Sequence, residues 1–495
     1  MGFAEETNAS PLGLAFIAIM ALLMLGLPRR WAFAPLVMTA CWMTLGQKIV
    51  LGGINLPALR LIVAATFLRL LVRGEFRLIR TMPIDWVVIG TVLVNASAYV
   101  LLWQTQEALI NRLGMVFNVL GMYLGFRSFV QNLEDVERVV KTVAWVLLPV
   151  AALMTVEQFT GRNLFAVLGG VPAMTVSRAG RLRCQGPFSH PILAGTFGAV
   201  WLPMFLGLYW WGKSKLAGIA GVLAATAMTV TSGSSGPVMT YMVGIVALGL
   251  WPIRHQMKLF RWGVVGLLVV MQIVMNKPVW FIFARINILS GSTGWHRSHL
   301  IDMAVEHLSE WVLLGIKSAK AWRVHAGDIT NHYLLEGLRG GLLAMVLFIW
   351  GMVWGFRYVG RTVRAYRLTN PSDREMRFVW SLGAMIAAHM MTFFSVAYFE
   401  PQSLMNWYLT LALAVALFLS NPMTRPQAMS RGAMNNGEDR RKFRRFGEAV
   451  AEPEREPEPE PELVTAAGPS PAGTERVWWG QARSGLASAE TPERA

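Results

Sequence analysis

The sequence predicts an all-α fold: a polytopic integral membrane helix bundle of about 11–13 transmembrane helices, with two long outer loops and a disordered cytoplasmic tail. Of its 495 residues, 54% are hydrophobic and 15% are charged, whereas soluble domains carry about a quarter charged residues. Apolar runs of about 20 residues recur along residues 12–420, as expected for membrane-spanning helices. The runs are continuously apolar and do not alternate, which argues against a β-barrel.

Thirteen apolar runs are candidate spans, of which the first three are the shortest or most ambiguous. The first run lacks a preceding basic region and a clear cleavage site, so it is interpreted as a retained helix and not as a signal peptide. The candidates cover about residues 12–27, 31–47, 56–72, 86–103, 112–130, 139–158, 191–211, 216–231, 236–252, 260–276, 340–356, 377–396 and 402–420.

Basic residues in the short connections predict the orientation, because Lys and Arg accumulate on the cytoplasmic side. They follow the odd-numbered spans, as at Arg29, Arg73 and Lys213, whereas the connections after spans eight and twelve have none. We therefore expect the N-terminus outside and the C-terminus inside. Two long loops, residues 159–190 and 277–339, would then lie on the outer face of the membrane.

The chain divides at about residue 420. Residues 1–420 form the predicted membrane domain, and residues 421–495 the predicted tail. The tail holds a basic cluster at residues 440–445 and the Glu-Pro run 452–462. This composition cannot bury a core, so we expect an extended cytoplasmic segment whose basic cluster rests on anionic lipids.

Neither a metal nor a cofactor is expected. The chain has two cysteines, Cys41 and Cys184, and no CxxC or other metal spacing. The histidines at 296, 299 and 307 do not have the spacing of a metal site either. No nucleic-acid partner is expected.

The first long loop is a candidate anion site because it ends in basic residues that run directly into a span. Arg181 and Arg183 precede Pro191, which begins the apolar run. Arginine forms paired hydrogen bonds to phosphate, and a helix start offers unpaired N–H groups. A pyrophosphate would suit this junction. The alternatives are a proline-started helix with basic anchors at the interface, or contact with anionic lipid head groups.

The second long loop offers further arginines and candidate bases. Residues 297–314 predict an amphipathic helix that begins at Arg297, and Arg323 follows it. His325 and His332 come next, and a histidine beside an apolar bundle can act as a general base. His332 directly precedes a glycine-containing apolar helix. A structural role at the interface is the alternative for each histidine.

Taken together, these residues resemble the O-antigen ligase and O-antigen polymerase superfamily over about residues 140–420. Three stretches carry the resemblance. Residues 183–195 are similar to the family's Arg, Gly-x-Phe, Asn-Pro run; residues 231–236 resemble its Thr-x-Ser-Arg-Gly turn; and residues 294–340 resemble its large outer loop and closing helix.

The resemblance implies a membrane glycosyltransferase that transfers or polymerises an undecaprenyl-diphosphate-linked glycan during assembly of O-antigen or exopolysaccharide. It implies that Arg181, Arg183, Arg297 and Arg323 hold the diphosphate and that a histidine assists the acceptor hydroxyl. The implied partners are the lipid-linked donor, a glycan or lipid-core acceptor, membrane lipids and polysaccharide-assembly proteins. Neither a metal nor a nucleotide sugar is implied.

The chain departs from the family pattern at three places. His190 stands before Pro191 where the family more commonly has Asn. Ser235 stands where the family usually has Arg, which puts a phosphate contact from that turn in doubt. The family's His-Asn pair appears here as Asn331-His332, so His325 rivals His332 as the catalytic histidine. A transporter or flippase of lipid-linked oligosaccharide is the alternative function; it predicts ionisable residues within spans and repeated halves. A non-catalytic scaffold is a third.

Overall fold

The computed structural model describes residues 9–51, 54–178, 180–282, 294–322, 329–368 and 372–421. All of them belong to one compact unit, residues 1–425. The tail predicted for 421–495 lies outside the described residues except for Asn421.

The protein is an all-α polytopic membrane protein, as the sequence predicts. Among the described residues, eight helical segments are long and apolar enough to cross a membrane, and three shorter apolar helices accompany them. Each of the thirteen predicted spans overlaps one helix of the bundle. The helices are α1 (Pro11–Gly26), α2 (Phe33–Trp42), α3 (Ala58–Val72), α4 (Pro83–Trp103), α5 (Gln106–Phe129), α6 (Leu133–Thr160), α7 (Pro191–Trp211), α8 (Lys215–Thr231), α9 (Ser235–Gly249), α10 (Met257–Val274), α12 (Gly294–Glu306), α13 (Leu308–Trp311), α14 (His332–Leu368), α15 (Asp373–Ser395) and α16 (Pro401–Ser420).

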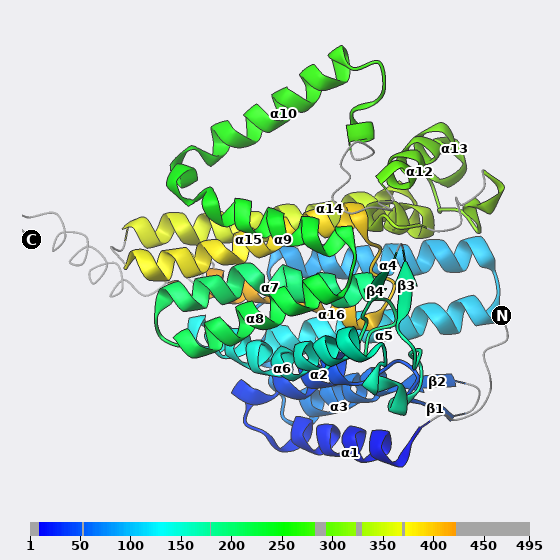
Figure 1. The fold of residues 1–495 in the computed structure, drawn as a ribbon, viewed down its shortest axis with the longest axis vertical. Helices are drawn as coiled ribbons and strands as arrows, with labels where there is room; N and C mark the ends of the chain where they lie inside the picture. Colours follow the sequence, from blue (N-terminus) through cyan, green and yellow to red (C-terminus); the bar gives the residue numbers. More distant parts are fainter. Residues whose placement is uncertain are drawn as a thin grey trace, which may run out of the picture. The chain divides into compact units, whose positions relative to one another are not determined.

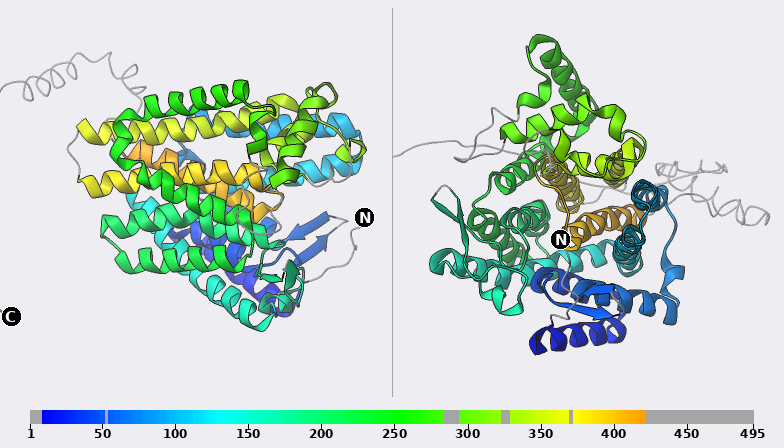
Figure 2. Two further views of the ribbon diagram at one scale, coloured as in Figure 1. Left: turned by 45° about the horizontal axis from the view of Figure 1, so that its top comes forward. Right: turned by 90° about the vertical axis from the view of Figure 1, so that its right-hand side faces the viewer.

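Two antiparallel hairpins lie at one end of the bundle, which we call the loop end (Figure 1). The first pairs β1 (Lys48–Leu51) with β2 (Ile54–Pro57), and the second pairs β3 (Val176–Arg178) with β4 (Arg181–Arg183). Helices α12 and α13 lie at this end as well, as the views of Figure 2 also show.

The position of each helix in the bundle follows from how much of its circumference is apolar. Helix α16 is apolar on all sides and almost wholly buried between α5, α14 and α15, as expected for a central helix. Helix α7 is similarly enclosed by α8, α9 and α15. Helix α10 has no buried residue and stands away from the bundle in Figure 1.

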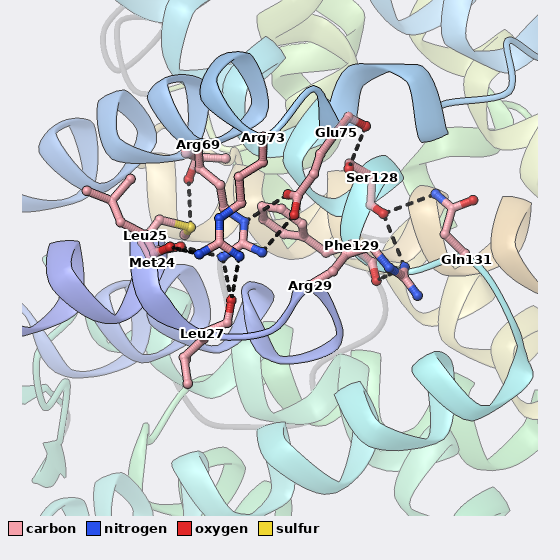
Figure 3. Close-up of polar contacts among 11 residues, drawn as sticks. Met24, Leu25, Leu27, Arg29, Arg69, Arg73, Glu75, Ser128, Phe129 and Gln131 are labelled. Carbon is pink, nitrogen blue, oxygen red and sulfur yellow. Dashed lines mark hydrogen bonds and ion pairs between the residues drawn. The ribbon is translucent and has the colours of Figure 1, made fainter.

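The end opposite the loops is held by polar contacts that include the buried ion pair of Arg69 and Glu75 (Figure 3). Arg69 is fully buried, and its guanidinium forms two hydrogen bonds of 2.8 Å to the carboxylate of Glu75. It also donates to the carbonyl oxygens of Met24 and Leu27 at 2.7 and 2.8 Å. These bonds join the end of α1 to α3. Because the arginine has such a full set of partners, we assign it a structural role.

Helix α14 contains a break that shapes the loop end. Gly341 has φ 75° and ψ 175°, in the left-handed region that glycine tolerates. The segment after α13 occupies the break: Leu342 N–H donates to the Val312 carbonyl at 2.9 Å, and Ile316 N–H donates to the Leu338 carbonyl at 2.8 Å. The backbone groups freed by the break are therefore satisfied, as a membrane protein requires.

Two predicted boundaries change in the second long region. Helix α14 begins at His332 and not at about residue 340, so the loop predicted for 277–339 ends earlier. The helix predicted for 297–314 is divided into α12 and α13 at His307. Leu300, Ala304 and Trp311 of its apolar face pack on Leu334 and Leu338 of α14. This packing is why the chain turns back to helix before the glycines.

Candidate functional site

The first long loop is anchored by Glu157 at the end of α6. One oxygen of Glu157 accepts hydrogen bonds of 3.1 Å from Gln185 N–H and from the Thr175 hydroxyl. The other accepts from Gly186 N–H at 3.0 Å. A single carboxylate thus holds the residues on both sides of the β3–β4 hairpin and fixes where its arginines lie.

Arg183 lies against the turn between α8 and α9. Its Nη2 donates to Ser234 Oγ at 2.7 Å, and the neighbouring Cys184 N–H donates to the Thr231 carbonyl at 3.0 Å. Gly233 permits this close approach: it has φ 55°, and a Cβ there would lie 2.7 Å from the Leu182 carbonyl oxygen. The two stretches that resemble the family motifs are therefore in contact, through Ser234 and not through Ser235.

Arg178, Arg183 and Arg297 form what we call the arginine cluster. Burial lowers the pKa of Arg183 and that of Arg297, the latter to about 10, and the positive charge of Arg178 lowers both further. Arg297 is 6% exposed. The Nε atoms of Arg183 and Arg297 are buried and have no hydrogen-bond partner among the described residues.

The cluster has cations from two separate loops and no carboxylate paired with Arg183 or Arg297 in the described part of the chain. Partly buried like charges without a counter-ion cost free energy unless an anion binds between them. The open Nε–H donors are suited to the oxygens of a phosphate. The arrangement therefore fits an anionic ligand.

The remaining predicted arginines divide between two cases. Arg181 is exposed and pairs with Arg178 across the hairpin, so it lies at the edge of the cluster. Arg323 lies outside the described residues, as does the candidate base His325.

His332 is the first residue of α14 and is buried, with 1% of its surface exposed. The rings of Phe348, Phe393 and Tyr398 surround it at centroid distances of 4.9, 5.0 and 5.6 Å. Its Nδ1 accepts a hydrogen bond of 3.2 Å from the Tyr398 backbone N–H. A neutral imidazole that accepts at Nδ1 carries its proton on Nε2.

That Nε2 faces Glu336, one helical turn further along α14. The distance from Nε2 to Glu336 Oε1 is 3.7 Å, too long for a hydrogen bond. The other Glu336 oxygen accepts from Asn95 Nδ2 of α4 at 2.9 Å. Glu336 lines a cavity of about 570 Å³ at the loop end, whereas His332 does not. A ligand in the cavity can therefore reach the Glu336 carboxyl group but not the His332 ring behind it.

Glu400, at the start of α16, is a further buried carboxyl. Its Oε1 accepts from Ser189 N–H at 2.9 Å, and its buried Oε2 has no partner among the described residues. Burial raises the pKa of Glu400 to about 8, and the Ser189 bond opposes that rise. Glu400 joins the end of the first long loop to α16.

The other described histidines of the second loop have local partners. His299 stacks on Trp295, with ring centroids 4.9 Å apart. His307 contacts Glu310 at 2.7 Å and stacks on Trp322. Within the described ranges, no group of three or more His, Cys, Asp or Glu side chains could hold a metal ion.

Three residues of the cavity, Asn95, Arg112 and Arg339, are not among the predicted site residues. Arg112 and Arg339 are ionisable residues in or beside apolar spans, which is a recognised sign of function in membrane proteins. That sign was available, but only the fold shows that the two arginines line one cavity.

No family model matches the chain, and no curated protein matches it.

Proposed function

We propose that the protein is a metal-independent membrane glycosyltransferase of the O-antigen ligase and polymerase type. It would take a glycan from undecaprenyl diphosphate and join it to a second glycan or a lipid core, with its loop end periplasmic and its tail cytoplasmic in a cell inner membrane. The observation that carries the proposal is the arginine cluster, in which the buried Nε–H donors of Arg183 and Arg297 come from two loops and neither arginine is paired with a carboxylate in the described part of the chain.

The proposed reaction follows from these groups. The acceptor hydroxyl oxygen bonds to the anomeric carbon of the donor, and the bond from that carbon to the diphosphate oxygen breaks. Arg183 and Arg297 stabilise the charge that gathers on the leaving diphosphate. The hydroxyl proton passes to the pair formed by Glu336 and His332. Holding both substrates in line supplies much of the remaining barrier reduction.

The arginines provide the direct test. In a reconstituted assay with a lipid-diphosphate-linked glycan donor, Arg183→Ala and Arg297→Ala should each lower transfer about 100-fold or more, as expected for loss of a group that stabilises developing charge. Lysine should restore activity only in part, because it cannot form the paired hydrogen bonds. Arg162→Ala, an exposed arginine of the same loop, is the matched control. Full activity in both alanine variants at normal protein levels would refute the diphosphate role.

A deletion strain would distinguish the two reactions within the proposal. Single repeat units accumulating on lipid would indicate a lost polymerase, and long lipid-linked chains would indicate a lost ligase.

One observation favours the transporter alternative. Arg112, Glu336 and Arg339 are contributed by two candidate spans and meet in one cavity, and ionisable residues between spans also occur along transport paths. Proteoliposomes that hold both donor and acceptor would separate the functions. A transferase forms a new glycosidic bond, whereas a flippase moves the lipid-linked glycan between leaflets without forming one.

A further inference from the structure

The cavity that Glu336 lines contains a second group of cations, separate from the arginine cluster. It lies between the loop-end halves of α4, α5 and α14, and its wall is completed by Arg60, residues 316–320, Ile329, Tyr398, Phe399, Pro401 and Leu404. None of Arg178, Arg183 and Arg297 lines it. At about 570 Å³ it is within the usual size range of small-molecule sites. We call it the Arg112 cavity.

Charge in the Arg112 cavity is strongly unbalanced. The described lining residues include a single carboxylate, that of Glu336, and one of its oxygens already accepts from Asn95. The basic lining residues are Arg60, Arg112, Lys317, Lys320 and Arg339. Lys317 and Lys320 are exposed at the opening, whereas Arg112 lies at depth. An anionic ligand entering from the loop end would meet positive charge along its whole path.

Arg112 is arranged as a binding group. It is 5% exposed, and its guanidinium carbon lies 3.5 Å from the centroid of the Tyr99 ring. This stacking fixes the plane of the guanidinium. Its buried Nε has no hydrogen-bond partner in the described structure, and neither does the buried Oδ1 of Asn95. The cavity wall thus offers an unused charged donor and an unused amide acceptor.

The rest of the lining suits a sugar better than a bare phosphate. Trp103 and Phe399 provide flat apolar faces, on which the C–H face of a sugar ring can pack while its hydroxyls stay polar. The side chains of Asn111 and Asn118 add amide groups that both donate and accept hydrogen bonds. An acidic sugar needs this combination: an arginine for its carboxylate, amides for its hydroxyls and aromatic rings for its faces.

We propose that the Arg112 cavity binds an acidic saccharide, one that carries carboxylate groups, and that this saccharide is the acceptor of the transfer. The assignment as acceptor rests on the proposed function. The position supports it, because Glu336 and Tyr398 both line the cavity and both contact His332. The acceptor hydroxyl would then reach the proton-accepting carboxylate from the cavity side, with the donor diphosphate at the arginine cluster.

Binding of a soluble probe tests the saccharide class without requiring transfer. The purified full-length protein in lipid nanodiscs would be titrated calorimetrically with a short oligogalacturonate and with a neutral oligogalactan of equal length. We expect saturable binding of the acidic oligomer at least about tenfold tighter than that of the neutral one, since one good charged contact contributes about 1.4 kcal/mol or more. Equal affinities would overturn the proposal.

Variants locate the binding. Arg112→Gln and Arg339→Gln should each weaken oligogalacturonate binding about tenfold or more, whereas Arg162→Ala should leave it unchanged. Loss of a buried arginine can unfold the protein, so two substitutions at exposed positions serve as a second test. Lys317→Glu and Asn111→Asp add negative charge to the cavity wall without disturbing the core. They should weaken binding several-fold, and unchanged affinity in these two would place the ligand elsewhere and overturn the proposal.

A polyprenyl phosphate titrated under the same conditions identifies the other anionic source. Binding of that lipid, lost in Arg112→Gln, with no binding of oligogalacturonate would make the cavity a lipid-phosphate site and overturn the proposal. The two proposals fail separately. If the protein does not bind the saccharide but still performs transfer that depends on Arg297, only the assignment of the cavity as the acceptor site is refuted. If the protein binds the saccharide but performs no transfer, the glycosyltransferase proposal is refuted, while the assignment of the cavity to acidic saccharides stands.

Discussion

His332 and Glu336 lie one turn apart at the start of α14, and of the two only Glu336 lines the Arg112 cavity. If the pair accepts the proton of the acceptor hydroxyl, His332→Ala and Glu336→Gln should each lower transfer by a factor of about 10² to 10⁴. Donor affinity should change little. The readout is transfer rate against donor concentration in the reconstituted assay.

His307→Ala is the control, because that histidine pairs with Glu310 at the protein surface. The effect of His325→Ala should be much smaller than that of His332→Ala. If His325→Ala inactivates the protein and His332→Ala does not, His325 takes the catalytic role. If Glu336→Gln alone is harmless, His332 accepts the proton directly after a change of tautomer.

Glu400 should make stability depend on pH. Its carboxyl stays protonated in the folded protein up to pH about 8, but in the unfolded chain only up to about 4.5. The folded state therefore binds one more proton between these values, so the free energy of unfolding should fall as pH rises through this window, by about 1.4 kcal/mol per pH unit. Thermal unfolding in detergent between pH about 5 and about 8 measures it.

Glu400→Gln should remove this slope, because the amide does not titrate. Glu107→Gln, at an exposed position in the first turn of α5, should keep it. A slope that persists unchanged in Glu400→Gln would assign the pH dependence to another group.

The sequence predicts the kinds of residue at the site better than their partners. Arg183 and Arg297 stood out because arginines before a span suit a phosphate, and the structure brings both within reach of the charge of Arg178. The burial of His332 was not foreseen, since it follows from Tyr398 and Phe393, some 60 residues away along the chain. Residue type is local information, whereas a partner across the bundle depends on how the helices pack.

The break in α14 at Gly341 determines how the segment after α13 packs against α14. A Cβ at Gly341 would lie 2.1 Å from the Leu313 carbonyl oxygen. The φ of Gly341, +75°, is also unfavourable for any L-residue with a side chain. Gly341→Ala should therefore destabilise the protein by about 1–3 kcal/mol. It should also expose the segment after α13 to protease. The measurements are the melting temperature and limited proteolysis.

Gly263 of α10 is the matched control, since an added Cβ there meets nothing within 4 Å. Gly263→Ala should be neutral or slightly stabilising, because alanine is the better helix former. Equal effects of the two substitutions would show that the break at Gly341 is not required for packing.

For whole elements, the sequence predicts a helix wherever an apolar run is long. All thirteen runs became helices because a membrane leaves the backbone few other ways to satisfy its hydrogen bonds. The start of α14 was missed because residues 332–339 include Glu336 and Arg339, and polar residues there suggested a loop. They are helical because Leu334 and Leu338 pack on α12, which is tertiary information.

The two ends of the helix bundle differ in how their charged residues are paired. The loop end holds the arginine cluster and the Arg112 cavity, and among the described residues basic groups outnumber carboxyl groups in both. At the opposite end, arginines such as Arg69 and Arg127 are paired with Glu75 and Asp85. The proposed function needs the loop end to face the compartment where lipid-linked glycans are joined, and the predicted orientation supplies that.

Cysteine labelling of intact cells tests this orientation. A cysteine at Ser177, an exposed position on the hairpin of the first long loop, should react with a membrane-impermeant maleimide. One at Ser470 in the tail should react only after permeabilisation. The background should be low, because Cys41 and Cys184 are both fully buried and burial raises the pKa of the Cys184 thiol to about 12, which leaves almost no reactive thiolate. Labelling at Ser470 in intact cells, with none at Ser177, would invert the topology. The arginine cluster would then face the cytoplasm, and a periplasmic transfer reaction at this site would be impossible.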